Sequence, residues 1–251
     1  MTNHIETETL CFPNGRNACA VRVFDDTQAA AILSALALGT PRALVVIAGG
    51  AGGMSDEEIN RVRPLFVDGL ARLAAQECVA ILDGGTNSGV MSLIGEGVAR
   101  HGLTAPLIGV CPAAVVSWPG NHNPNAEAEL EPNHSHFVLT AGDEFGTESE
   151  TIYTLAEALS QEMPSVALIV NGGQITYDEA LKNVAQGREL IVFKGSGRAA
   201  DVIAAAWEKS QTEDPRIAEI VRWGKITLFD VVEGPEKLAT LIRQSLWRQT
   251  Q

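Results

Sequence analysis

Two stretches of the sequence decide the fold, and each is a short apolar run that ends in glycines. They read Ala43-Leu-Val-Val-Ile-Ala-Gly-Gly-Ala-Gly-Gly53 and Val79-Ala-Ile-Leu-Asp-Gly-Gly-Thr-Asn-Ser-Gly89. Short runs of Val, Ile, Leu and Ala without polar alternation are typical of strands that are buried on both faces of a sheet. Because a longer amphipathic stretch follows each run, both stretches predict a strand, a tight turn and a helix.

The same alternation continues almost to the end of the 251 residues. We expect strands at Ala20–Phe24, Ala43–Ala48, Val79–Leu82, Leu107–Cys111, Phe137–Thr140, Val166–Val170, Glu189–Phe193 and Lys225–Phe229. We expect helices at Gln28–Leu38, Glu57–Gln76, Gly89–Arg100, Glu150–Gln161, Tyr177–Gln186, Arg198–Lys209 and Pro235–Trp247. This order predicts an α/β, Rossmann-like, doubly wound and mainly parallel sheet with helices on both faces. Since no repeat or low-complexity linker interrupts it, we expect one domain over residues 1–251, with the helices within 212–247 packed on its core.

Residues 112–135 interrupt the alternation. The segment contains Pro119, Pro124 and Pro132, several asparagines and a cluster of acids, and it shows little periodicity. A long irregular segment inside a compact domain is usually either functional or mobile. Two interpretations stay open: a flap beside the ligand site, or a disordered surface loop.

Charge and composition narrow the possible partners. The formal net charge is −13, from 18 Lys and Arg against 31 Asp and Glu. Nucleic acids and anionic membranes need a basic footprint, so neither is expected as a partner. No apolar run reaches eighteen residues, no signal peptide opens the chain, and the four cysteines form no C-x-x-C pair. We therefore expect no membrane insertion and a cytoplasmic location.

Glycine clusters follow four of the expected strands and precede a helix in each case. They are Gly49–Gly53, Gly84–Gly89, Gly172–Gly173 and Gly195–Gly197. In a parallel sheet the carboxyl ends of the strands meet at one edge, where ligands bind. Glycine lets the backbone approach a phosphate, and the following helix presents free N–H groups and its positive dipole end. The pattern predicts a phosphate-bearing small molecule, although no Walker A sequence occurs and no G-x-G-x-x-G fingerprint follows the first strand.

The candidate ligand-binding residues come from these loops and from the end of the irregular segment. They are Gly50, Gly52, Gly53, Gly84, Gly85, Thr86, Asn87, Ser88, Gly89, His134, Gly172, Gly173, Thr176, Gly195, Ser196, Gly197 and Arg198. Arg198 starts a helix, where a cation opposes the dipole, so it either binds a phosphate or pairs with Asp201. His134 either contacts ligand, caps the loop or is a plain surface histidine.

Other polar residues allow further interpretations. His122, His134 and His136 lie near several glutamates, but their spacing matches no standard zinc pattern, so we expect no metal. Glu148 and Glu150 suit the first turn of a helix on dipole grounds, or a ribose hydroxyl. Trp207, Trp223 and Trp247, with the apolar residues Leu241, Ile242 and Leu246, either belong to the core or form the interface of a homodimer or higher homo-oligomer.

Three segments carry a resemblance to a known family. They are Asp83-Gly-Gly-Thr-Asn-Ser-Gly-Val-Met91, Glu131-Pro-Asn-His-Ser-His-Phe137 and Lys194-Gly-Ser-Gly-Arg-Ala-Ala-Asp201. The chain resembles the SLOG-domain superfamily, in its prokaryotic LSDAT type, over roughly residues 45–206. Related domains form the cytosolic N-terminal region of melastatin-type TRP channels. The resemblance implies a Rossmann-like fold that senses, or sometimes processes, a nucleotide-derived ligand such as ADP-ribose or an NAD derivative.

A more distant resemblance, to the Lonely Guy phosphoribohydrolases, implies an enzyme. Their signature P-G-G-x-G-T-x-x-E aligns with Asn171-Gly-Gly-Gln-Ile-Thr-Tyr-Asp-Glu179, which places Glu179 on the catalytic carboxylate and Thr176 on the threonine. Asn171 replaces the proline and Ile175 the third glycine. The helix expected at Glu150–Gln161 also lacks the arginine of that family. We therefore favour ligand binding, with an N-glycosidase or phosphoribohydrolase-like activity as the alternative and an assembly protein with a vestigial site as the third hypothesis.

Overall fold

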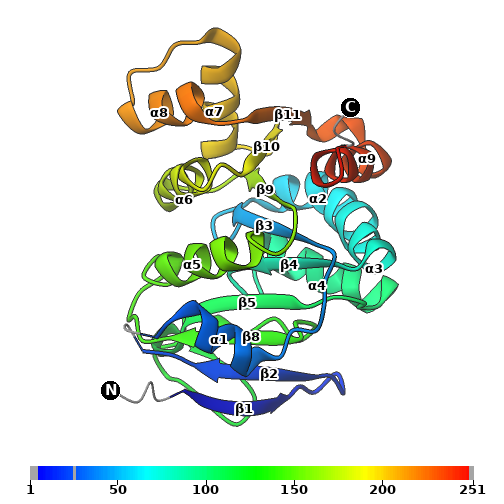
Figure 1. The fold of residues 1–251 in the computed structure, drawn as a ribbon, viewed down its shortest axis with the longest axis vertical. Coiled ribbons are helices and arrows are strands. Elements are labelled where there is room, and N and C mark those ends of the chain that lie inside the picture. Colours follow the sequence, from blue (N-terminus) through cyan, green and yellow to red (C-terminus); the bar gives the residue numbers. More distant parts are fainter. Residues whose placement is uncertain (1–4, 25–26, 249–251) are drawn as a thin grey trace.

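The structure, a computed structural model, describes residues 5–24 and 27–248. Its centre is a nine-stranded sheet in the order β1-β2-β8-β5-β4-β3-β9-β10-β11 (Figure 1). Only the β1–β2 pair is antiparallel, and every other neighbouring pair of this sheet is parallel. The strands are β1 (Glu6–Cys11), β2 (Asn17–Arg22), β3 (Ala43–Gly49), β4 (Val79–Asp83), β5 (Leu107–Pro112), β8 (His136–Thr140), β9 (Ser165–Val170), β10 (Glu189–Lys194) and β11 (Ile226–Asp230). The doubly wound, mainly parallel sheet expected from the sequence is confirmed.

The chain reverses its direction of travel across the sheet at β3. From β3 it proceeds through β4, β5 and β8 toward one edge, and it then returns to place β9, β10 and β11 on the other side of β3. The switch point therefore lies between β3 and β9. A crevice opens at such a point on the carboxyl side of the strands, because the loops leave in opposite directions. For β3 and its neighbours β4, β5 and β8, that side of the sheet faces left in Figure 1.

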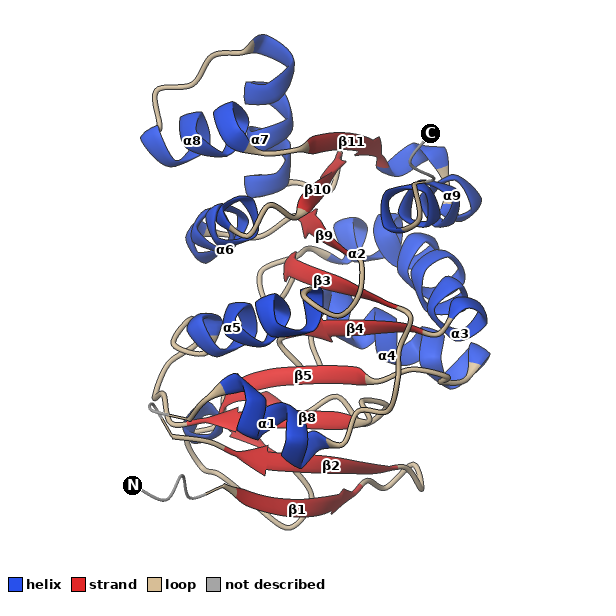
Figure 2. Ribbon diagram, viewed as in Figure 1, coloured by secondary structure: helices blue, strands red, loops and turns tan. Residues whose placement is uncertain are grey.

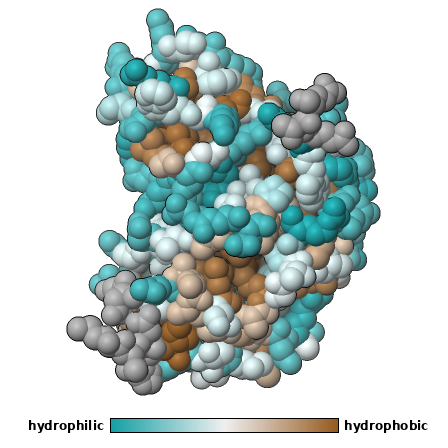
Figure 3. Space-filling model, in the orientation of Figure 1, coloured by the Kyte–Doolittle hydropathy of each residue, from teal (hydrophilic) through white to brown (hydrophobic). Residues whose placement is uncertain are grey.

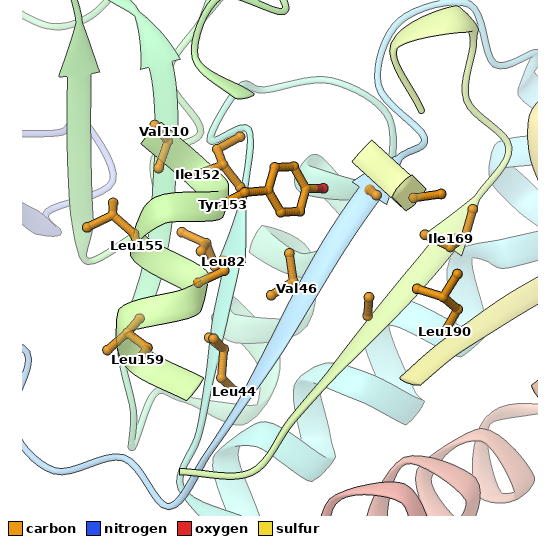
Figure 4. Close-up of a cluster of buried hydrophobic side chains, with 14 of the residues drawn as sticks. Leu44, Val46, Leu82, Val110, Ile152, Tyr153, Leu155, Leu159, Ile169 and Leu190 are labelled. Atoms are coloured by element: carbon orange, nitrogen blue, oxygen red, sulfur yellow. The ribbon is translucent and has the colours of Figure 1, made fainter. Parts of the chain in front are cut away.

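Helices cover both faces of the sheet (Figure 2). One layer holds α1 (Ala29–Leu36), α5 (Ser149–Ser160), α6 (Gln174–Ala185), α7 (Arg198–Lys209) and α8 (Pro215–Trp223). The other holds α2 (Asp56–Pro64), α3 (Arg72–Glu77), α4 (Gly89–His101) and α9 (Pro235–Leu246). Figure 4 shows how Leu155 and Leu159 of α5 pack on Leu44, Val46 and Leu82 of the sheet. Alternate strand residues point into the two layers, so the central strands β3, β4, β5 and β9 are apolar along most of their length.

The irregular segment 112–135 takes the place of a helix over β2, β5 and β8. It forms a short 3₁₀ turn at Ala113–Val115 and two two-residue strands, β6 (Val116–Ser117) and β7 (Ala128–Glu129). Trp118 and Leu130 from this segment pack against Phe137 in a third apolar cluster. The segment has a defined structure with its own core contacts, and part of it borders the cleft described below.

The single helix expected at Glu57–Gln76 is divided by Pro64. The residues before it form α2, residues Leu65–Ala71 form a π-helical segment, and α3 follows. A proline inside a helix removes one N–H donor and clashes with the carbonyl four residues earlier. The wider π turn is one of the arrangements by which a helix absorbs such a disturbance.

The sequence analysis did not predict β1, and it placed α8 only within the range 212–247, where C-terminal helices were expected. Strand β1 is polar along most of its length, and only Leu10 of its side chains is buried, because β1 forms the edge of the sheet. Helix α8 is short, but it carries a clear start signal: Asp214 accepts a hydrogen bond from the Arg216 amide, and Pro215 stands at the first helical position. Within the described residues, no helix is both long and apolar enough to cross a membrane.

Candidate functional site

A cleft of about 570 Å³ lies at the carboxyl ends of β3, β4 and β9, at the switch point of the sheet. The surface outline in Figure 3 is indented on this side. Several residues expected at the site from the sequence line this cleft: Gly50, Gly52, Gly84, Thr86, Ser88, Gly172, Gly173, Thr176, Glu179 and Arg198. Segments far apart in the sequence thus converge on one concave surface, a common form of small-molecule site.

Three helix N-termini open onto the cleft. The residues that precede α4, α5 and α6, namely Ser88, Glu148 and Gly173, all line it. The first amides of a helix have no carbonyl partner within the helix, and the helix dipole adds positive potential there. The cleft therefore combines N–H donors with a field that favours anions.

Arg198 supplies a cation at the cleft. It has a positive φ of 49°, and its guanidinium lies over Gly53 and Gly173. A Cβ added at Gly53 would meet Arg198 Nη1 at 2.9 Å, and one added at Gly173 would meet Nη2 at 3.0 Å. No hydrogen bond or ion pair joins the Arg198 side chain to any residue within 5–24 or 27–248. The planar fork is therefore available to a ligand oxyanion.

The competing interpretation, an ion pair between Arg198 and Asp201, is not what the geometry shows. Asp201 Oδ1 accepts a hydrogen bond from the Gly195 amide at 2.6 Å, and Oδ2 accepts one from the Gly197 amide at 3.1 Å. The carboxylate thus occupies the two backbone donors that the sequence offered to a phosphate. Ser196 is fully buried, and its hydroxyl donates to the Phe193 carbonyl. None of Gly195, Ser196 and Gly197 lines the cleft, and only Arg198, directly after this loop, does so.

Two carboxyl groups line the cleft, Glu148 directly before α5 and Glu179 in α6. Burial, together with the negative charge of Glu148, raises the pKa of Glu179 to about 8. Burial also raises the pKa of Glu148, whose Oε2 accepts a hydrogen bond from the Gly146 amide at 2.6 Å. A carboxyl with a pKa near 8 is mostly protonated at neutral pH, so Glu179 can donate a hydrogen bond or a proton there.

His134 lies beneath the cleft, fully buried between two acids. Its Nε2 is 2.9 Å from Asp83 Oδ1 and its Nδ1 is 2.8 Å from Glu131 Oε2. Although burial disfavours the charged ring, the two carboxylates raise the pKa of His134 to about 9. Asp83 Oδ1 also accepts the Gly85 amide, and the Glu131 amide donates to the Gly85 carbonyl. We call Asp83, His134 and Glu131 the buried triad, and it ties the irregular segment to the second glycine loop.

Other candidate glycines are needed for packing. A Cβ at Gly85 would lie 2.6 Å from the Gly109 Cα, and one at Gly89 would lie 1.9 Å from the Gly50 carbonyl oxygen. Asn87 accepts a hydrogen bond from the Ser92 hydroxyl and does not line the cleft. Because of the contact with Gly109, a larger residue at Gly85 would disturb the sheet itself, so loss of binding in such a variant would not report contact with a ligand.

The cleft also contains residues that sequence reasoning did not place there. Phe145, Ile152 and Ile175 give it an apolar wall, and Glu127 and Ala128 of the irregular segment close one side. Ile175 had one signal in the sequence, because it stands where the aligned signature has its third glycine. The others carry no local signal, because their position depends on how α5 and residues 112–135 lie across the sheet edge.

The histidines do not converge on a metal site. His134 belongs to the buried triad, His136 Nδ1 is 2.8 Å from the Ser135 hydroxyl, and His122 is exposed. Among the residues that the structure describes, no group of three or more His, Cys, Asp or Glu side chains is arranged to hold a metal ion.

Comparison with known proteins bears directly on this arrangement. A family model described as "SLOG in TRPM, prokaryote" matches residues 42–240, which include every loop of the cleft. The chain belongs to this family. The match confirms the resemblance to the prokaryotic LSDAT type of SLOG domain that the glycine loops indicated.

Similar sequences occur in animal ion channels. The chain is 26% identical to transient receptor potential cation channel subfamily M member 2 of Rattus norvegicus, over 73% of this chain and 15% of the channel. It is 26% identical to transient receptor potential cation channel subfamily M member-like 2 of Nematostella vectensis, over 92% of this chain and 18% of that channel. It is 28% identical to subfamily M member 7 of Homo sapiens, over 65% of this chain and 10% of that channel. The matched region is therefore less than a fifth of each of these channels.

A solved structure supports the fold. The X-ray structure of the structural-genomics target TM1055 superposes on this chain with a TM-score of 0.52 and 22% sequence identity. The match covers 80% of this chain and 98% of that one. At this level of identity the likeness establishes the Rossmann-like architecture of the SLOG domain.

Proposed function

We propose that this SLOG domain binds a nucleotide-derived ligand, similar in shape to ADP-ribose or an NAD derivative, in the cleft at the switch point. The observation that carries the proposal is the position of Arg198. Its guanidinium lies over Gly53 and Gly173 beside the N-terminus of α6, and within the described chain no acid lies within ion-pair distance of it, although the negative charge of Glu58 is near enough to interact with it. Arginine in such a position suits bidentate binding of a phosphate, to which the helix amides add further donors.

The charges of the cleft suggest how the ligand is oriented. Three of its lining residues are acids (Glu127, Glu148 and Glu179), and Arg198 is its cation among the described lining residues. Phosphates therefore belong near Arg198 and the glycine loops, whereas sugar hydroxyls suit the two carboxyls of α5 and α6. With a pKa of about 8, Glu179 adds no full negative charge at neutral pH, so an anionic ligand is repelled less than the count of acids implies.

A second candidate is hydrolysis of an N-glycosidic bond. It is favoured by Glu179, a cleft carboxyl that is protonated at neutral pH and can protonate the departing base. The C–N bond to the sugar would break as the base takes the proton of Glu179, water would add its hydroxyl to the sugar carbon, and the remaining proton of that water would return to Glu179. Helix α5 supplies no arginine to this end of the cleft, and Ile152 lines it there. This difference favours binding without cleavage.

We also propose that the chain functions in the cytoplasm. Its four cysteines are all free in the structure, as expected for a reducing compartment.

A third possibility, an assembly protein with a vestigial site, predicts no saturable nucleotide binding at all.

A thermal-shift panel of ADP-ribose, NAD, AMP and cyclic ADP-ribose tests the proposal. A ligand at a hundredfold excess over its dissociation constant stabilises the fold by about 2.7 kcal/mol. The matched variant is Gly52→Leu, because Gly52 lines the cleft and a Cβ there meets nothing within 4 Å. We expect Gly52→Leu to keep the unliganded melting temperature and to lose the shift. The absence of a shift with every nucleotide would overturn the proposal.

Cleavage is tested on the ligand that binds. Incubation followed by chromatography would show whether free base and a ribose phosphate appear. Release that is lost in Glu179→Gln, with binding retained, would establish the second candidate. An unchanged ligand after long incubation would exclude it.

A further inference from the structure

The sheet ends in two edge strands that differ in how they are protected. Strand β1 carries Glu6 and Glu8, and charges of this kind discourage pairing with a further strand. Strand β11 forms the opposite edge, in the upper part of Figure 1, and residues 226–229 include neither a charge nor a proline. The first three of these residues are partly exposed. The β11 edge is therefore one to which a further strand can add.

The backbone of β11 has unused hydrogen-bonding groups on its outer side. The Lys225 carbonyl accepts a hydrogen bond from the Leu190 amide at the start of β10. Alternate residues of a strand direct their N–H and C=O groups to opposite sides, so Thr227 also faces β10. The N–H and C=O groups of Ile226 and Leu228 therefore point outward, where no strand of the described residues pairs with them.

These outward groups determine how a second copy of the chain can pair with the edge. Antiparallel pairing about a two-fold axis through Thr227 sets Ile226 opposite Leu228 of the second copy, and their outward groups then form four hydrogen bonds. An axis through Leu228 would need the outward Asp230 amide, which already donates to Glu233 Oε1 at 3.3 Å. The available donors and acceptors therefore favour the register centred on Thr227.

The charges at the two ends of β11 are complementary under this two-fold axis. At its start lie Arg222 and Lys225, and neither forms an ion pair with an acid among the described residues. At its end lie Asp230 and Glu233, of which only Glu233 has a cationic partner in the described chain, Lys237 at 3.0 Å. Antiparallel pairing brings the basic end of each strand beside the acidic end of the other, and the axis repeats this contact twice. A second copy of this chain therefore supplies the charges that each end lacks.

Exposed apolar side chains stand at the same two ends. Trp223 directly precedes the turn into β11 and is 64% exposed, and Val232 follows the strand and is 83% exposed. They are the two most exposed large apolar side chains among the described residues. Pairing about the axis brings the Trp223 end of one copy to the Val232 end of the other. Apolar surface at both ends would then be removed from water.

We propose that β11 pairs antiparallel with β11 of a second copy of this chain, about a two-fold axis at Thr227, so that the two nine-stranded sheets continue into each other. Pairing of one short strand gives a small interface, so we expect a dimer that dissociates at micromolar concentration. The cleft assigned above includes no residue of β11. The proposal therefore does not depend on nucleotide binding.

The test combines sedimentation velocity with residue-resolved amide hydrogen exchange of the full chain, from micromolar to near-millimolar concentration. We expect the sedimentation coefficient to rise from that of a monomer to that of a dimer. Over the same range the Ile226 and Leu228 amides should become slow to exchange, whereas the Thr227 amide, which is bonded within the sheet, should be slow throughout. A monomer at every concentration would overturn the proposal and leave the edge to a strand of another protein. A dimer in which the Ile226 and Leu228 amides still exchange fast would overturn it as well, because the copies would then meet elsewhere.

Charge reversal tests which ends of the strands meet. Lys225→Glu places an acid beside the acidic end of the second copy, and the axis repeats the change, so the dimer should weaken about tenfold at low salt and less at high salt. The matched control is Arg16→Glu, which makes the same change of charge directly before β2, at the opposite edge of the sheet. This control should dimerise as the parent protein does. Equal weakening by both variants would mean that net charge alone acts, and it would contradict the proposed pairing.

A second pair of variants tests the apolar contact. Trp223→Ala should weaken the dimer several-fold and keep the melting temperature of the monomer, because the indole is largely exposed. Phe24→Ala also removes an exposed aromatic side chain, but it lies after β2, far across the sheet, and it should leave dimerisation unchanged. If Trp223→Ala dimerises as strongly as the parent protein, the ends of the two strands do not meet and the proposed register is wrong.

Discussion

The buried triad predicts that the free energy of unfolding falls as pH rises from 6.5 toward 9.5. The pKa of His134 is about 9 in the folded protein against an ordinary value of 6.5. Because the folded state binds this proton more tightly, the stabilisation is fully present below pH 6.5 and is lost as pH rises through 9. At about 1.4 kcal/mol for each pKa unit, the loss amounts to roughly 3 kcal/mol.

Glu179 changes stability in the same direction at lower pH. Its pKa of about 8 lies above that of an unfolded glutamate, so the folded state binds more protons between about pH 4.5 and 8 and loses stability across that range. The assay is therefore urea unfolding in the Glu179→Gln background at pH 6.5, 8 and 9.5. The parent protein should lose more stability than this variant between pH 6.5 and 8. The difference reports Glu179, and the remaining loss up to pH 9.5 reports His134.

NMR titration of the His134 imidazole provides a reading at the residue itself. We expect this ring to stay protonated through pH 7.5 and to titrate near its raised pKa of about 9. A ring that titrates near 6.5, or a flat unfolding free energy in Glu179→Gln from pH 6.5 to 9.5, would refute the reasoning about the triad.

Two further predictions concern the supports of the site. Gly95→Ala should lower the free energy of unfolding by about 2–4 kcal/mol, because its new methyl group would lie 2.0 Å from Glu131 Oε1 and displace that carboxylate. This loss outweighs the gain of about 1 kcal/mol in helix propensity. Equal or higher stability in urea unfolding would contradict the prediction. Asp201→Asn should lower the free energy of unfolding by about 1–2 kcal/mol, since the amides of Gly195 and Gly197 lose a charged hydrogen-bond acceptor. The hydrogen-exchange rates of these two amides should rise. Unaltered exchange would show that the carboxylate does not hold the loop.

The fold followed from the sequence because its signals are local. Buried parallel strands read as short apolar runs, and a glycine pair such as Gly172–Gly173 marks the turn into the next helix. The convergence of the loops then follows from the topology, since all carboxyl ends of parallel strands share one edge. For this reason the sequence alone predicts that the loops Gly49–Gly53, Gly84–Gly89 and Gly172–Gly173 lie at one common site.

The roles of individual side chains were less predictable. His134 and Asp83 are far apart in the sequence. No local sequence pattern therefore predicts that the His134 ring is buried between two acids, because this arrangement depends on the tertiary structure. Gly195 and Gly197 look like phosphate-binding glycines, but Asp201 from the next helical turn satisfies their amides. A glycine loop before a helix therefore indicates available donors only when no acid in the following turn can reach back to them.

We propose that Arg198 and the glycine loops bind the phosphates of a nucleotide derivative. Isothermal titration with ADP-ribose tests it most directly in three proteins: the parent chain, Arg198→Gln and the control Arg222→Gln, whose arginine lies over Trp223 outside the cleft. We expect saturable binding to the parent and the control, with affinity at least tenfold weaker in Arg198→Gln. No binding to the parent, or equal affinity in all three proteins, would contradict it.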